Sequence, residues 1–129
     1  MTAARGRPRG GLERDVLACL AAAGRPLSPT EVLSDLGGDL AYTTVMTTLS
    51  RLHSKGVLNR EAAGRGFAYE LPVSLGEVPT SMSAHRMRRI LDSGDDRAGI
   101  LARFVSDLNP EDEEVLLHLL SQDPPTLEH

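Results

Sequence analysis

The sequence of 129 residues contains a single cysteine, Cys19. One cysteine rules out an internal disulfide and a metal site made of clustered cysteines. Its place in an apolar helical stretch is typical of a small buried side chain. The longest apolar run, residues 16–23, is too short to span a membrane. Charged residues at 13–15 interrupt the position where a signal peptide would have its apolar core. We therefore expect a cytoplasmic protein.

Motifs of catalysis and cofactor binding are also missing. None of the four histidines belongs to an HExxH or HxxxH pattern, and the sequence has neither a GxGxxG nor a Walker loop. The acidic run at 111–114 could suggest ligands for a hard cation, but its place in the first turn of a helix explains it adequately. The sequence therefore predicts a protein that is not an enzyme and needs no metal or cofactor.

Basic and acidic residues are distributed unevenly, although the net charge is -4. Residues 1–75 hold nine basic and seven acidic side chains, and residues 76–129 hold five and eleven. A basic front half and an acidic back half fit contact with nucleic acid at one end and another role at the other.

The front half has the pattern of three helices. Apolar residues from Leu12 to Leu20 follow helical spacing, and Gly24 ends that helix. The segment 28–31, Ser-Pro-Thr-Glu, is a capping box that starts a second helix, which Gly37 ends. A third helix covers about residues 41–55 and stops at Gly56.

Two short strands are expected after these helices, at 57–61 and 67–71, joined by a turn at 62–66. In the second strand Phe67 and Tyr69 alternate with smaller or polar residues, as in a half-buried strand. Three helices followed by a hairpin is the order of a winged helix, in which the second and third helices form the helix-turn-helix.

The back half is expected to be helical after a connector at 73–79. Helices are predicted at 81–91, 96–108 and 110–120, the last capped by Asn109. Their apolar stripes are too continuous for three short helices to bury alone, so we expect a dimer. The residues expected to close it are Ile90, Leu91, Ile100, Leu101, Phe104, Val105, Leu108, Val115, Leu116, Leu119 and Leu120.

The predicted fold class is thus mainly α with a small β-hairpin. We expect a flexible basic arm at 1–10, a winged helix-turn-helix domain at 11–75 and a helical dimerisation region at 76–126. Residues 127–129 look like the start of a vector-encoded tag. The arm contains the segment 5–8, Arg-Gly-Arg-Pro, which is either a minor-groove hook or a plain basic tail.

The third helix carries the strongest functional signal. One side of it holds Val45, Leu49 and Leu52, and the opposite side has hydroxyls and one arginine without a carboxylate. Threonine and arginine can read base edges, and a face without acids can approach phosphates. A merely solvated face would usually include glutamate, and threonine is a poor helix former. We expect the major groove to be contacted by Thr43, Thr44, Met46, Thr47, Ser50 and Arg51.

The turn between the predicted strands resembles the tip of a wing. Gly64 and Gly66 permit a tight turn, and Arg65 between them would reach phosphate or the minor groove. Arg60 and Lys55 are expected to address phosphates or the groove beside the wing.

Residues 41–61, followed by 64–71, resemble the penicillinase-repressor (BlaI/MecI-type) family of winged-helix transcriptional regulators. The family pattern T-V-x-T-x-L-x-R-L-x-x-K-G matches at Thr44, Val45, Thr47, Leu49, Arg51, Leu52, Lys55 and Gly56. The resemblance implies a homodimer that represses genes by binding a palindromic operator in double-stranded DNA. It also implies derepression by a membrane sensor protease that leads to cleavage in the dimerisation helices.

Three departures from the family pattern matter. Met46 stands where several members have arginine, which implies a different base preference. Arg103-Phe104 replaces the Asn-Phe of protease-regulated members, so proteolytic induction stays open. The cysteine-rich tail of copper-responsive members is missing. The rival interpretation is a winged-helix module that binds another protein and no DNA. The overall acidity favours that rival, and the acid-free helix face favours DNA.

Overall fold

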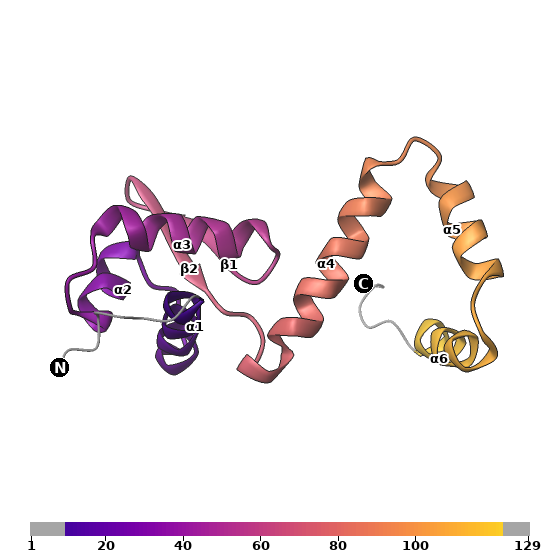
Figure 1. Ribbon diagram of the computed structural model, residues 1–129, viewed down its shortest axis with the longest axis horizontal. Coiled ribbons are helices and arrows are strands. Elements are labelled where there is room, and N and C mark those ends of the chain that lie inside the picture. Colours follow the sequence, from indigo (N-terminus) through magenta and orange to yellow (C-terminus); the bar gives the residue numbers. More distant parts are fainter. Residues whose placement is uncertain (1–9, 123–129) are drawn as a thin grey trace. The chain divides into compact units, whose positions relative to one another are not determined.

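The computed structural model describes residues 10–122. The basic segment 5–8 and the tag-like residues 127–129 lie outside this range. The chain forms two compact units, Met1–Met87 and Arg88–His129, which are described separately (Figure 1). The prediction of a mainly helical chain with one small β-hairpin is confirmed.

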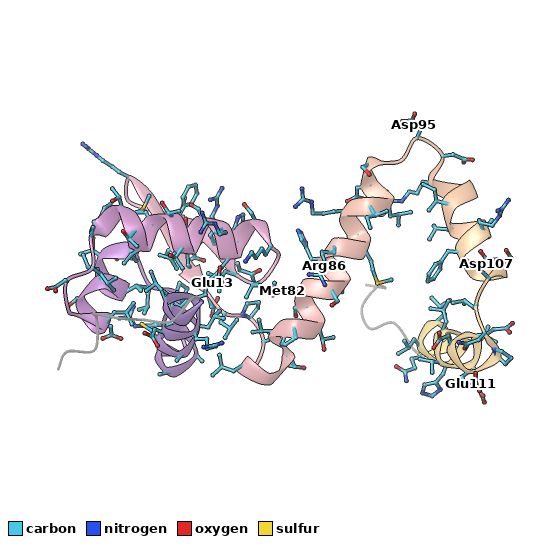
Figure 2. All side chains as sticks on the ribbon, in the orientation of Figure 1. Glu13, Met82, Arg86, Asp95, Asp107 and Glu111 are labelled. Carbon is cyan, nitrogen blue, oxygen red and sulfur yellow. The ribbon has the colours of Figure 1, made fainter. Side chains whose placement is uncertain are left out.

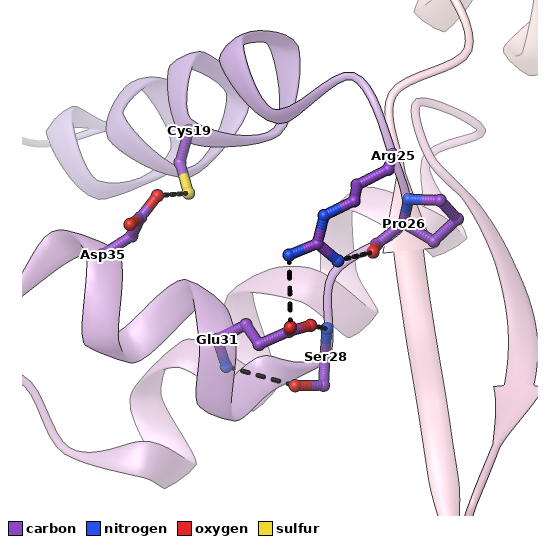
Figure 3. Close-up of polar contacts among 6 residues, drawn as sticks. All are labelled: Cys19, Arg25, Pro26, Ser28, Glu31 and Asp35. Atoms are coloured by element: carbon purple, nitrogen blue, oxygen red, sulfur yellow. Dashed lines mark hydrogen bonds and ion pairs between the residues drawn. The ribbon is translucent and has the colours of Figure 1, made fainter.

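Three helices open the first unit: α1 (Gly11–Ala23), α2 (Pro29–Leu36) and α3 (Tyr42–Ser54). The predicted capping box starts α2. The Glu31 backbone N–H donates to the Ser28 hydroxyl at 3.1 Å, and the Ser28 N–H donates to the Glu31 carboxylate at 2.9 Å (Figure 3). This second bond lowers the pKa of Glu31, and Arg25, 3.3 Å from the same carboxylate, acts in the same direction. The start of the helix-turn-helix is therefore fixed by local bonds.

The hairpin consists of β1 (Asn59–Ala63) and β2 (Gly66–Glu70), paired antiparallel with Ala63 opposite Gly66. Its turn is therefore the two residues Gly64 and Arg65, with Gly64 at a φ of 59°, where glycine meets no steric penalty. The first strand was predicted to begin too early, and the predicted turn was too long. Val57 and Leu58 precede the strand and are buried in the core.

The predicted alternation in the second strand was wrong in detail. Phe67 is 40% exposed, whereas both Ala68 and Tyr69 are buried. Tyr69 exchanges two backbone hydrogen bonds with Leu27, of 2.8 and 2.9 Å. This added bridge forms hydrogen bonds along the second edge of β2. Phe67 is instead covered in part by the Arg60 guanidinium, 4.1 Å from the centre of its ring.

The core of the first unit lies between the three helices and the base of the hairpin. The predicted stripe of α3 faces inward, since Val45, Leu49 and Leu52 are at most 1% exposed. The residues of this core share an apolar side chain and almost complete burial. They are Val16, Leu20, Leu27, Val32, Val45, Leu49, Leu52, Val57, Leu58, Tyr69 and Val78.

Val78 extends this core into the segment that was expected to be a connector. A 3₁₀ turn η1 (Leu75–Glu77) is capped by Ser74 and Glu77, and α4 (Val78–Ser93) follows at once. Val78 is 7% exposed and Met82 packs against the same core. The prediction of an irregular connector through residue 79 was therefore wrong, because apolar contacts hold the first turns of α4 on the domain.

The second unit contains the end of α4, α5 (Arg97–Ser106) and α6 (Pro110–Ser121). Asp96 caps α5 by accepting from the Gly99 N–H at 3.0 Å, and Asn109 caps α6 as predicted, accepting from the Asp112 N–H at 2.7 Å. No residue of α5 or α6 is buried in the single chain. Among the helices of residues 10–122, none has the length and apolar character needed to cross a membrane.

Candidate nucleic-acid interface

The outward side of α3 is a polar surface without acidic residues. Thr43, Thr44, Thr47 and Arg51 are exposed, and Met46 and Ser50 are half-buried. The sequence of α3, YTTVMTTLSRLHS, contains no carboxylate. Within the described part of the chain, the Arg51 guanidinium forms no ion pair. All six residues predicted for the major groove are therefore accessible on one helix, which the buried stripe fixes from behind.

This surface is hollowed in two places. A hollow of about 440 Å³ is lined by Met46, Thr47, Ser50, Arg51 and Ser54. A second hollow, of about 290 Å³, lies between the start of α2, the start of α3 and the hairpin. Its lining includes Ser28, Thr30, Tyr42, Met46, Arg65 and Phe67. Met46 thus lies at the junction of the two hollows, and the wing arginine shares the second hollow with the third helix.

Tyr42 and Thr30 were not among the predicted interface residues. Tyr42 is 46% exposed at the first position of α3, and Thr30 is exposed in the first turn of α2. Both line the hollow that contains Arg65. Their position at helix starts, where backbone N–H groups are free, is the sequence signal that could have identified them.

Lys55 is held by an ion pair that was not predicted. Its ammonium lies 3.1 Å from the carboxylate of Glu13 in α1, and the pair is partly buried. The bond ties the C-terminal end of α3 to α1. A phosphate contact by Lys55 would therefore compete with this ion pair.

Arg60 and His85 lie close enough to His53 to affect its charge. The His53 ring is half-buried and meets the Tyr69 ring edge to face, with 6.5 Å between their centres. Burial lowers the pKa of His53, and repulsion by Arg60 and His85 lowers it further. Arg60 was expected to contact phosphates or the groove beside the wing. It lines a hollow of about 380 Å³ together with Glu61 and Glu70.

Cys19 is half-buried rather than fully buried. Its thiol lies 3.2 Å from the Asp35 carboxylate of α2 (Figure 3). Burial and this carboxylate together raise the pKa of the thiol to about 11. At neutral pH the thiol is therefore protonated and serves as a hydrogen-bond donor between two helices.

Many large apolar side chains of the second unit are exposed. Of the eleven residues predicted to close a dimer, Leu91, Leu108 and Leu116 are half-buried and the others are exposed. Ile90 and Leu120 reach 68% and 74% exposure. Leu117, 61% exposed, adds an apolar residue that the predicted stripe left out. A monomeric protein rarely leaves such a dense set of large apolar side chains in water.

Three helices, a hairpin and an exposed acid-free third helix define a winged helix-turn-helix protein. The chain belongs to the penicillinase repressor family, whose pattern matches residues 9–122. It is 30% identical over 115 residues to the transcriptional regulator BlaI of Mycobacterium tuberculosis, in strains CDC 1551 / Oshkosh and ATCC 25618 / H37Rv. The alignment covers 88% of this chain and 83% of that relative. The protein is therefore a transcriptional regulator and not an enzyme.

Solved structures show a looser likeness. The transcriptional regulator Tm0710 from Thermotoga maritima aligns with a TM-score of 0.42 and 24% identity, over 84% of this chain and 68% of that one. A mutant of MarR from E. coli aligns with a TM-score of 0.43 and 22% identity, over 84% of this chain and 73% of that one.

Proposed function

We propose that the protein is a dimeric repressor that binds a palindromic operator in double-stranded DNA. The observation that carries this proposal is the exposed side of α3, which bears hydroxyls, Met46 and Arg51 and no carboxylate. Inserted in the major groove, such a side can meet base edges with hydroxyl, methyl and guanidinium groups. Acting on DNA, the protein would work in the cytoplasm.

The wing supplies the second contact. Arg65 is exposed at the two-residue turn and shares a hollow with Tyr42 and Met46 at the start of α3. In this position its guanidinium would bind the phosphate strand beside the groove that α3 enters. Arg60 and Lys55 would add charge near the same DNA, Lys55 only after releasing Glu13.

The second unit would form the two-fold interface of the dimer. Its exposed apolar residues on α5 and α6 would be buried against the same residues of a second chain, because the commonest homodimer uses one patch twice. A two-fold protein matches an operator whose half-sites repeat with opposite orientation.

Gel-shift titration of the full chain against genomic fragments, at several salt concentrations, tests the proposal. A regulator that contacts phosphates should bind at low salt and weaken as salt rises, with selected fragments retained longest. Absence of DNA binding at low salt would overturn the proposal and favour a winged helix that binds protein.

A further inference from the structure

The C-terminal end of α3 is bordered by a residue of α4. Gly56 follows α3 with a φ of 80°, and a Cβ at this position would collide with the His85 side chain. His85 is therefore in close contact with the backbone that ends the third helix. Within the first unit, this contact fixes the middle of α4 beside that helix end.

Helical spacing along α4 shows where Arg86, the residue after His85, lies. Val78 and Met82 pack on the domain core, and Arg86 follows Met82 by four residues, so it shares their side of the helix. Figure 2 shows Met82 and Arg86 one above the other on α4. At the level of the α3 end, His85 lies on the domain side of α4 and exposed Arg86 lies beside it, about a quarter of a turn round the helix.

Arg86 is exposed, and its guanidinium donates to the Ser83 hydroxyl at 3.3 Å. In the described part of the chain it forms no ion pair, whereas Arg88 pairs with Asp92 at 3.7 Å. Lys55, which directly follows α3, is held by Glu13. Arg86 therefore offers this helix end a positive charge that no described carboxylate pairs.

The dimensions of α3 would bring a phosphate strand to this place in a DNA complex. A helix of 13 residues is about 20 Å long, and the major groove is about 12 Å wide, so α3 crossing the groove would have phosphates near both of its ends. The N-terminal end has Tyr42 and Arg65 beside it. The C-terminal end carries the negative pole of the helix dipole, which repels phosphate unless a cation offsets it.

We propose that Arg86 binds a backbone phosphate of duplex DNA at the C-terminal end of α3, and that His85, seated on Gly56, positions it. The proposal extends the DNA-binding surface beyond the helix-turn-helix and wing into α4. It rests on the proposed function, because it needs DNA in contact with α3.

The test is the salt dependence of binding to an arbitrary duplex of about 40 base pairs at a fixed pH of about 8. Full-length wild type is compared with Arg86→Gln, Arg88→Gln and Arg65→Gln. One lost phosphate contact lowers the slope of log K against log salt by about 0.9 per bound chain, or affinity about eightfold at about 0.1 M salt. We expect this loss for Arg86→Gln and Arg65→Gln and no loss for Arg88→Gln, which removes the same charge from another side of α4.

Two results would overturn the assignment while leaving DNA binding intact. One is an unchanged slope for Arg86→Gln when Arg65→Gln lowers it. The other is an equal loss for Arg86→Gln and Arg88→Gln, which would indicate a general effect of net charge. If the wild type fails to bind any duplex at low salt, the proposed function fails first and this inference with it.

The positioning role of His85 is tested by combining His85→Ala with Arg86→Gln. His85→Ala removes the side chain that meets Gly56, so Arg86 should no longer be held at the helix end. In the His85→Ala background, Arg86→Gln should then change the slope by much less than in the wild type. Full additivity of the two substitutions would show that His85 has no positioning role.

Discussion

Met46 is the residue on which sequence preference should depend most. It lies at the junction of two hollows, one along α3 and one that contains Arg65. A thioether cannot donate to guanine, but its methyl end can lie against a thymine methyl. The side chain is half-buried, so a longer polar substitute would extend toward the groove.

Met46→Arg should therefore shift the preference at one base pair in each half-site towards G·C. The expected discrimination is about 1–3 kcal/mol, the usual size of a bidentate contact to guanine. Selection on randomised half-sites measures it, with Met46→Leu as the matched control that keeps an apolar side chain. Identical preferences of wild type and Met46→Arg at every position would show that residue 46 does not face the bases.

His53 gives the first unit a dependence on pH. Burial lowers its pKa below the ordinary value of 6.5, and Arg60 and His85 add to this effect. Below about pH 6.5 the unfolded chain binds a proton that the folded chain resists, so stability due to neutral His53 is lost as pH falls. Above that pH this contribution is fully present.

Replacing His53 by Gln should flatten this dependence. Denaturant unfolding between about pH 7.5 and 5.5 should show a smaller fall in the free energy of unfolding for His53→Gln than for wild type. Parallel pH profiles of the two proteins would contradict the assignment of this effect to His53.

At the scale of elements, the capping box is the feature that holds α2 in place. The Ser28 hydroxyl accepts from the Glu31 N–H, and the Glu31 carboxylate accepts from Ser28 and Arg25. Ser28→Ala should lower the free energy of unfolding by about 0.5–2 kcal/mol, as for other N-cap residues. Chemical denaturation measures the loss.

Ser34→Ala is the control for this prediction. Ser34 is exposed on the same short helix and has no part in the cap. It should change stability by no more than about 0.5 kcal/mol. Alanine is the better helix former, so helix propensity alone gives no loss at either position. Equal losses from the two substitutions would therefore show that the cap is not the cause.

Elements with local causes were predictable from the sequence. The caps at Ser28 and Asn109 and the buried stripe of α3 depend on residues a few positions apart, and all were found as expected. Contacts between distant residues were not predictable. The bridge of Leu27 to Tyr69 pairs the second edge of β2, and it joins residues far apart in the sequence.

The same division applies to the candidate site. The outward residues of α3 follow from helical spacing, so their exposure was predictable. The Lys55–Glu13 ion pair and the contact of His85 with Gly56 join separate elements, and only folding brings them together. Val78 was missed because Met82, which packs against the same core, lies beyond the predicted connector.

At the scale of the whole molecule, self-association should depend on the second unit. Sedimentation of the full chain at micromolar concentration should give a dimer, and residues 1–87 alone should give a monomer that binds operator weakly. The cut follows Met87 because Val78 and Met82 complete the core of the first unit. A monomeric full chain at this concentration would refute the dimer.

Because α5 and α6 bury no side chain within one chain, a second copy would complete their packing in the proposed dimer. The stability of this unit would then rise with the concentration of the protein, because its folding would require two chains. Occupancy of an operator should therefore increase more steeply than copy number at low expression. At such low expression, halving the supply of a dimer-forming regulator would lower operator occupancy by more than half.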